Sequence, residues 1–291
     1  MAEVVLRRGE EKDIYAGHLW IYDNEVRELR GEVEDGGIVN VVSSAGVFLG
    51  RGYINRRSRI LVRLMTFRRE EIDRDFLRRR LTAAIELRRR LGLANSCRVV
   101  FAEADYLPAL IVDKFADCLV LQTLALGIDR MKADVVDLLR ELLGPRCIYE
   151  RNDVPLRARE GLSQRTGALY GTSPGRVEIS EHGLRLLVDI ENGQKTGYFL
   201  DQRENRAAIE PFVRGAEGLD CFCHTGSFAL HAAKYGARSV EAVDISADAL
   251  ALARENAALN GMDSIVFRQA NVFDLLREAD RNGRQFEHIG L

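Results

Sequence analysis

The sequence predicts a multi-domain α/β protein with an N-terminal β-barrel, a central α+β domain and a C-terminal parallel sheet covered by helices. Its 291 residues are too many for one typical hydrophobic core. The first 70 or so residues contain short alternating strands and turns. Beyond Asp201, helical and strand patterns alternate strictly, as in βαβ units. We expect domains at residues 1–72, 73–190 and 191–291.

The composition is that of an ordinary globular protein. Hydrophobic residues make up 46% of the chain and charged residues 30%. No apolar run approaches the ~20 residues that a membrane-spanning helix needs, and the N-terminus lacks the apolar core of a signal peptide. The five cysteines are odd in number and mostly scattered, which fits reduced thiols. A cytoplasmic protein without a membrane partner is therefore expected.

The first domain is predicted to carry a basic face. Residues 37–55 alternate β-branched and small residues, and residues 59–65 alternate arginine with apolar residues, so both segments predict strands. Between Asn40 and Arg69 there are seven arginines and no Asp or Glu. Arginine pairs bidentately with phosphate and stacks on bases, so this stretch favours nucleic-acid binding. The alternative is a merely solvated face.

The middle of the chain mixes strands and helices. An amphipathic helix is predicted in residues 70–93, with its stop at Gly92. The elements expected after it are strands at 97–103, 108–115 and 118–125, a helix at 128–144, a strand at 147–152 and a hairpin of 176–180 with 184–190. This mixture is typical of an α+β domain.

The last hundred residues predict a parallel sheet. The expected order is helix 201–213, strand 216–222, helix 227–236, strand 239–245, helix 246–261, strand 265–270 and helix 272–283. Asp201 and Glu204 have the D-x-x-E spacing of a capping box, which predicts that the first helix begins there.

Two cysteines, a histidine and a glycine lie within the stretch "DCFCHTG" at residues 220–226. A structural zinc site needs four ligands, usually as two spaced pairs, and no second cluster accompanies Cys221, Cys223 and His224. A nucleophilic cysteine needs an exposed thiolate and a positioned base. Cys221 ends a strand, and its side chain is expected to pack under the sheet. We therefore expect packing positions in a ligand loop, not reactive thiols.

Three strand ends predict a nucleotide-like ligand. Open α/β sheets bind ligands beyond the carboxyl ends of their strands, where Gly226 allows close backbone approach. Asp244 ends the next strand and can bind two ribose hydroxyls, and the pair Asn271 and Val272 after the third strand can hold an adenine. Together these features outline S-adenosylmethionine (SAM). The G-x-G-x-x-G pattern is absent, which disfavours a dinucleotide oxidoreductase. The alternative is that Asp244 and Asn271 only cap helices.

Several motifs resemble one family. "GQKTGYFLDQRENR" (193–206), "LDCFCHTGSF", "VEAVDIS", "QANVFD" and "GHLWIY" (17–22) are similar to the PUA-containing class I methyltransferases of bacterial ribosomal RNA, most nearly the cytosine-C5 type of the large subunit. The resemblance runs over essentially the whole chain. It implies a PUA domain, a central α+β domain and a Rossmann-like methyltransferase domain. Two positions depart from the family: Asn271 replaces the usual Asp, and His224 a common aromatic residue.

The strand ends and the resemblance together indicate the site residues. Those expected at the cofactor are Phe199, Asp220, Phe222, Cys223, His224, Thr225, Gly226, Asp244, Ile245, Asn271 and Val272. Those expected at RNA are Trp20, Arg51, Arg56, Arg57, Lys195 and Arg203. Phe199 is expected to be exposed on a flap over the cofactor, with Lys195 and Arg203 near RNA or the methionine carboxylate. No metal site is expected, and a homodimer is left open.

The chain ends at "RQFEHIGL". In the family this strand continues into an Asp-Pro-Pro segment that faces the target base, followed by a loop whose cysteine attacks C6 of cytosine. Neither occurs here, so we expect the catalytic residues beyond Leu291, in a C-terminally truncated chain that does not transfer methyl groups. The sheet would then be incomplete, with one side of strand 219–223 largely unpaired.

The sequence thus predicts a SAM-dependent methyltransferase that forms 5-methylcytosine in large-subunit rRNA. One alternative acceptor is another rRNA position such as guanine N2, whose methylation needs no thiol. A second alternative is a short chain that binds RNA or SAM without catalysis.

Overall fold

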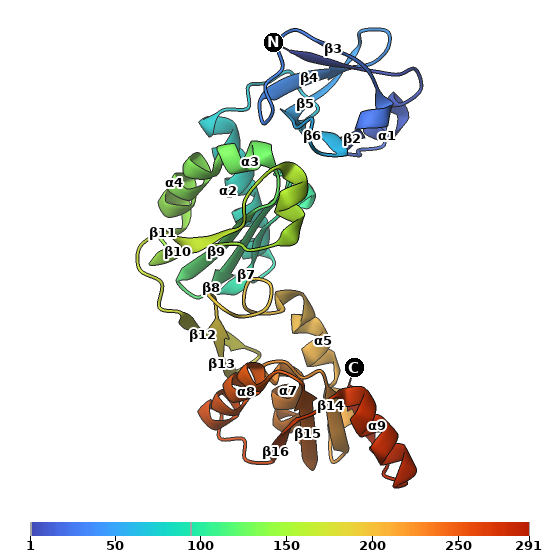
Figure 1. Cartoon of the computed structure of the whole chain (residues 1–291). Helices are drawn as coiled ribbons and strands as arrows, with labels where there is room; N and C mark the ends of the chain where they lie inside the picture. The colour runs from blue at the N-terminus through green and yellow to red at the C-terminus, as the bar shows by residue number, and fades with distance from the viewer. Residues whose placement is uncertain (1, 94, 291) are drawn as a thin grey trace. The chain divides into compact units, whose positions relative to one another are not determined.

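The computed structural model describes residues 2–93 and 95–290, and the chain forms two compact units, Met1–Pro174 and Gly175–Leu291 (Figure 1). The first unit contains two sheets with their helices. The second contains a hairpin and a parallel sheet. None of the helices in these described ranges combines the length and the apolar character that crossing a bilayer requires.

The N-terminal sheet of the first unit has six strands in the order β2-β6-β5-β4-β1-β3. The elements of this region are β1 Glu3–Leu6, α1 Glu11–Tyr15, β2 Trp20–Tyr22, η1 Asp23–Glu25, β3 Val26–Arg30, β4 Ile38–Val42, β5 Phe48–Ile54 and β6 Ile60–Thr66. Apolar side chains such as Val41, Ile54 and Leu64 fill its core. A Cβ on Gly52 would lie 2.0 Å from the carbonyl oxygen of Arg63, so only glycine lets β5 approach β6 this closely.

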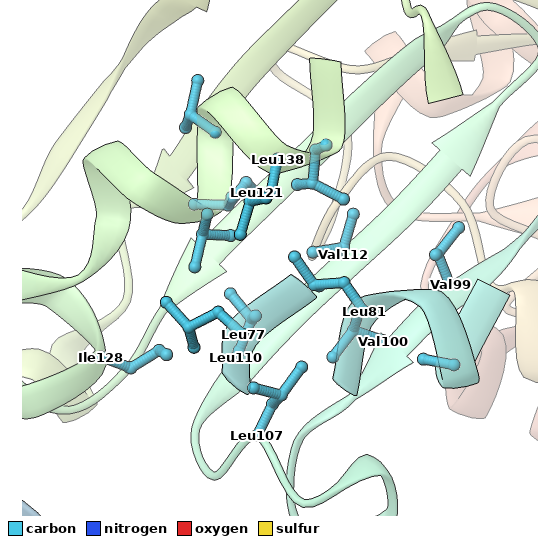
Figure 2. Close-up of a cluster of buried hydrophobic side chains, with 14 of the residues drawn as sticks. Leu77, Leu81, Val99, Val100, Leu107, Leu110, Val112, Leu121, Ile128 and Leu138 are labelled. Atoms are coloured by element: carbon cyan, nitrogen blue, oxygen red, sulfur yellow. The ribbon is translucent and has the colours of Figure 1, made fainter. Parts of the chain in front are cut away.

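The second sheet of the first unit has five strands in the order β11-β10-β9-β8-β7. The elements are α2 Arg74–Arg90, β7 Ser96–Phe101, η2 Ala102–Asp105, β8 Leu110–Phe115, β9 Cys118–Thr123, α3 Leu126–Arg130, α4 Lys132–Leu143, β10 Cys147–Asn152, η3 Pro155–Glu160 and β11 Arg165–Tyr170. The Asp73 side chain caps α2 by accepting from the Phe76 N–H at 2.8 Å. Figure 2 shows the core under this helix, with Leu77 and Leu81 beside Val100, Val112 and Leu138.

The second unit begins with the hairpin of β12 Arg176–Glu181 and β13 Leu184–Asp189, which the sequence had assigned to the central domain. Its parallel sheet has the order β16-β15-β14-β17. The remaining elements are η4 Leu200–Gln202, α5 Arg203–Ala208, α6 Glu210–Val213, β14 Glu217–Cys221, α7 Ser227–Lys234, β15 Ser239–Asp244, α8 Ala247–Leu259, β16 Ile265–Gln269, α9 Val272–Arg281 and β17 His288–Gly290.

Two local expectations for this unit are wrong. Strand β14 is paired on both sides, because Gly218 to Asp220 pair with β17, so the expected open side is closed and an incomplete sheet is not supported. The capping box also does not form. Helix α5 begins only at Arg203, after the 3-10 turn η4, and within the described chain its N-cap residue Gln202 makes no side-chain capping bond.

Candidate cofactor site

The site lies where three parallel strands end at the same edge of the sheet. The loop after β14 turns sharply, with φ of 58° at Phe222, 50° at His224 and 77° at Gly226. Such left-handed conformations are strained for residues other than glycine and are held by surrounding structure. Here the Cys223 N–H donates to the Val243 carbonyl at 3.0 Å, and a Cβ on Gly226 would come within 3.1 Å of the Phe267 ring. These contacts fix the shape of the loop, and glycine is needed at position 226 because a side chain there would crowd Phe267 and Ala253.

Asp244 holds this loop from the end of β15. Its Oδ2 accepts from the His224 N–H and its Oδ1 from the Ser246 N–H, both at 2.9 Å. The cap of α8 is Ser246, whose Oγ accepts from the Ala249 N–H at 3.2 Å, so the helix-cap alternative for Asp244 is wrong. Each carboxylate oxygen can accept a second hydrogen bond. The half-buried Asp244 can thus accept two hydroxyl groups without releasing either backbone contact.

Asp220 is a second carboxylate at the same edge. It is buried, and its Oδ2 accepts from the Ala229 N–H in α7 at 3.0 Å. Burial raises the pKa of Asp220 to about 7, although the hydrogen bond from Ala229 opposes the shift, and the charge of Asp244 adds to it. At neutral pH this carboxyl is therefore divided between its neutral and charged forms.

Two cavities flank the loop and share Phe199, Phe222 and His224 in their walls. One, of about 800 Å³, contains Asp244 and Ser246, and the other, of about 400 Å³, contains Asp220. Both volumes fall in the range of small-molecule sites. Because the cavities share these walls, the carboxylates of Asp220 and Asp244 lie in neighbouring cavities. This arrangement suits one extended ligand that has polar groups at both ends.

The segment before η4 packs onto the loop through aromatic contacts. The Lys195 ammonium lies 4.4 Å from the centre of the Phe199 ring, and that ring meets His224 edge-on at 5.3 Å between centroids. Phe199 is half-buried by these contacts, whereas the sequence predicted it exposed. Lys195 itself is exposed and stands in a left-handed conformation with φ of 56°. A flap role for this segment stays a prediction.

The cysteines of the loop are buried. Burial raises the pKa of the Cys221 and Cys223 thiols, so neither is a thiolate at neutral pH. This agrees with a packing role. Within residues 2–93 and 95–290, His, Cys, Asp and Glu side chains form no group of three or more with the geometry to hold a metal ion.

Comparisons with known proteins bear on both units. A family model described as a PUA-like domain matches residues 4–67, and one described as an S-adenosylmethionine-dependent methyltransferase matches residues 157–277. The ribosomal RNA large subunit methyltransferase I of Shewanella amazonensis is 43% identical over 99% of this chain and 74% of its own length. That of Aeromonas hydrophila is 42% identical over 100% of this chain and 75% of its own length. The chain belongs to the family of ribosomal RNA large subunit methyltransferase I.

Two solved structures of methyltransferases have the same fold as this chain. A protein described as a methyltransferase in complex with S-adenosylhomocysteine (SAH) is 20% identical, with a TM-score of 0.85 over 99% of this chain and 75% of its own. A SAM-dependent methyltransferase from Streptococcus mutans has a TM-score of 0.83 at 20% identity, over 99% of this chain and 76% of that one. The expected C-terminal truncation gains no support from matches that cover 99–100% of this chain.

The residues of this family member fit SAM. The groups that would hold it are the carboxylates of the half-buried Asp244 and the buried Asp220 and the backbone of residues 222–226. Exposed apolar side chains surround the third strand end, where Phe222 meets Phe273 at 5.7 Å and Ile245 is 69% exposed. Phe273 was missed by the sequence prediction. Its exposure, at 61%, on the first turn of α9 is unusual for a phenylalanine, but only the structure reveals it.

Some predicted cofactor residues play other parts. The Val272 side chain is buried in the core with Leu219 and Val243, and its contact with adenine stays a prediction. Asn271 is the N-cap of α9, because its Oδ1 accepts from the Phe273 N–H at 2.9 Å. Asn271 therefore caps α9, and its amide NH₂ and the second lone pair of its Oδ1 are left to meet a ligand. Thr225 is buried in the loop.

The three arginines predicted to bind RNA in the first unit differ in their exposure to solvent. Arg51 is buried, and its guanidinium donates to Asn40 and Glu71 at 2.9 and 2.8 Å, so its role at RNA is wrong. Arg56 is exposed but pairs bidentately with Asp35, at 2.9 and 3.2 Å. Arg57 is exposed.

Trp20 and Arg203 are both half-buried. The Trp20 indole N–H donates to Glu103 Oε1 at 2.8 Å, which joins β2 to η2 within the first unit. Its role at RNA stays a prediction, as does that of Arg203.

Proposed function

We propose that this chain binds SAM at the edge of its parallel sheet and methylates large-subunit ribosomal RNA in the cytoplasm. The observation that carries the proposal is the double anchoring of Asp244, which fixes a ribose-binding carboxylate against the loop of residues 222–226. The relatives over the whole chain are named for that substrate class.

The residues of the site bind and orient the donor. SAM supplies an electrophilic methyl group on a sulfonium centre. Asp244 accepts the ribose hydroxyls, and charge-assisted hydrogen bonds of this kind are among the stronger ones in proteins. The loop backbone and Asp220 face the methionine portion, while Phe222, Ile245 and Phe273 exclude water from the adenine. Holding the donor rigidly is what brings a methyl group to near-attack distance of an acceptor.

We propose C5 of cytosine as the acceptor atom, on the motifs that resemble the cytosine-C5 type. That chemistry needs a thiolate to attack C6 of the base. All five cysteines are buried, so none of them is placed for that attack. The burial of the cysteines is also the observation that favours the second candidate, an exocyclic nitrogen such as guanine N2, because that transfer needs no thiol.

One preparation of the chain tests the proposal by three measurements: calorimetric binding of SAH, filter binding of protein-free large-subunit rRNA, and tritium transfer from labelled SAM. Binding of both ligands is expected, and absence of SAH binding would overturn the proposal. Tritium in the RNA above a no-enzyme control is also expected, and this outcome would show that the inactivity expected from the sequence is wrong. Digestion of the labelled RNA to nucleosides then separates 5-methylcytidine from N2-methylguanosine.

A further inference from the structure

A third cavity lies in the first unit. It has a volume of about 350 Å³ and is formed where β6 ends beside α2 and η2. Its walls include two exposed aromatic side chains, Phe67 and Tyr106, the buried ring of Phe76, and three arginines, Arg68, Arg79 and Arg80. The size is at the lower end of the range of small-molecule sites, ~300–1,000 Å³, and suits one planar ring system.

Both aromatic rings are presented to solvent. Phe67 is 36% exposed and Tyr106 is 40% exposed, and the two rings meet edge-on at 6.4 Å between centroids. Tyr106 stands at φ of 55°, a left-handed conformation that is strained for a large side chain. Its N–H is held by the Glu103 carbonyl at 3.1 Å. This conformation ends η2, where Tyr106 is the C-cap residue, and leaves its ring at the wall of the cavity.

The charges in the cavity do not cancel. Glu70 carries a carboxylate here, and its two oxygens accept from the Thr66 hydroxyl and from Arg79, each at 2.7 Å. Arg79 is thereby neutralised. Arg80 instead lies 4.8 Å from the Tyr106 ring and 5.0 Å from the Phe76 ring, and it donates to a backbone carbonyl.

Two positive charges therefore remain, on Arg80 and on the exposed Arg68. Burial lowers the pKa of Arg80, the charge of Glu70 opposes this shift, and the charges of Arg68 and Arg79 add to it.

We propose that this cleft binds one unpaired RNA nucleotide, with its base against Phe67 and Tyr106 and its phosphate on Arg68 and Arg80. Bases that are splayed out of a helix stack on aromatic side chains and on guanidinium planes, whereas paired bases are not accessible to such contacts. Arginine is suited to the phosphate because its planar donors match phosphate oxygens. The inference rests on the proposed function, since it takes RNA as the substrate, and it adds that the bound RNA has an unpaired segment at this unit.

The test uses the whole chain and a fluorescent, unstructured RNA of twelve nucleotides, with the matching duplex and a free mononucleotide as comparison ligands. Tyr106→Ala and Phe67→Ala should each weaken binding of the single strand at least fivefold, about 1 kcal/mol. Duplex binding should be unchanged, and the mononucleotide should compete only weakly. Tyr106→Phe keeps the ring and should bind normally, which separates stacking from misfolding. Phe101→Ala is the matched control, because Phe101 is 51% exposed in the same unit but outside the cavity.

The phosphate contact is tested by the salt dependence of binding. Arg68→Ala should reduce the slope of log affinity against log salt by about one, while Arg90→Ala, exposed elsewhere on α2, should not. Equal binding by all variants, or equal weakening of single strand and duplex, overturns this inference and leaves the proposed function standing. No RNA binding by the unaltered chain overturns both.

Discussion

The Oδ2 atom of Asp244 accepts the backbone N–H of His224 at 2.9 Å, so the carboxylate that ends β15 holds the loop that follows β14. The other oxygen of Asp244 accepts the Ser246 N–H that leads into α8. One side chain therefore fixes two of the three strand ends of the cofactor site. In the proposed function the same carboxylate binds the ribose, so a change at Asp244 affects both the ribose contact and the shape of the loop.

Replacing Asp244 should weaken cofactor binding through both roles. We expect Asp244→Ala to lower the affinity for SAH at least tenfold, about 1.4 kcal/mol, since charge-assisted hydrogen bonds contribute about 1.5–3 kcal/mol each at most. Asp244→Asn keeps an acceptor for one backbone N–H but loses the charge, so an intermediate loss is expected. Calorimetry measures both, with Asp274→Ala on the exposed face of α9 as the control. Equal affinities would remove Asp244 from the site.

The sequence predicted the parallel sheet well because its strands are short, apolar and separated by amphipathic helices. It missed β11, whose residues are mostly exposed and whose sequence, RTGALY, does not alternate apolar with polar residues. It also missed the pairing of β14 with β17, which depends on contacts between residues about 70 positions apart. Asp244 was predicted from its place at a strand end, a local feature that the fold preserves.

Side-chain roles that depend on distant partners were harder to predict. Arg51 belongs to a run of arginines without acids, yet its partners Asn40 and Glu71 lie outside the local pattern and bury it. Val272 follows a polar residue, but the first turn of α9 directs it into the core. The spacing of Asp201 and Glu204 matches a capping box, but η4 occupies the turn where the helix was expected to begin.

Arg51 should matter for stability. Arg51→Ala leaves Asn40, which is 8% exposed, without its partner, and an unsatisfied buried group costs about 1–3 kcal/mol. Arg56→Ala removes only an exposed ion pair with Asp35 and should cost less than about 1 kcal/mol. Urea unfolding followed by the fluorescence of Trp20, the chain's single tryptophan, reports on this unit. Equal midpoints for the two variants would contradict the structural role of Arg51.

Arg56 and Arg57 should contribute to RNA affinity through phosphate contacts. Both are exposed, and the pairing of Arg56 with Asp35 can be exchanged for a phosphate because it lies in solvent. The double replacement by Ala should reduce the slope of log affinity against log salt by about 0.7–0.9 for each arginine. Titrations of rRNA at two salt concentrations measure this, with Arg89→Ala on α2 as a control for an exposed arginine elsewhere. An unchanged slope would show that these two arginines are only solvated and do not contact phosphate.

The buried Asp220 should make the second unit less stable as the pH rises. Its pKa is raised by burial to about 7, from 3.8. Between these values the folded state holds a proton that the unfolded state has lost, so the free energy of unfolding falls as the pH rises through this window. The contribution is fully present below about pH 4 and is lost above about pH 7, with an upper bound of about 4 kcal/mol.

The measurement compares this chain with Asp220→Asn, which keeps an acceptor for the Ala229 N–H but does not titrate. Hydrogen exchange of the β14 amides, followed at pH 5 and pH 8, should show the smaller difference in protection between the two proteins at pH 5, where less of the contribution has been lost. At pH 8 the Asn variant should be better protected, because it carries no buried charge. Asp274→Asn, at an exposed carboxylate, should track the unaltered chain at both pH values. The Asp220→Asn variant and the unaltered chain are compared by the ratio of their protection. If this ratio stayed constant from pH 5 to pH 8, Asp220 would ionise as an ordinary surface carboxylate does.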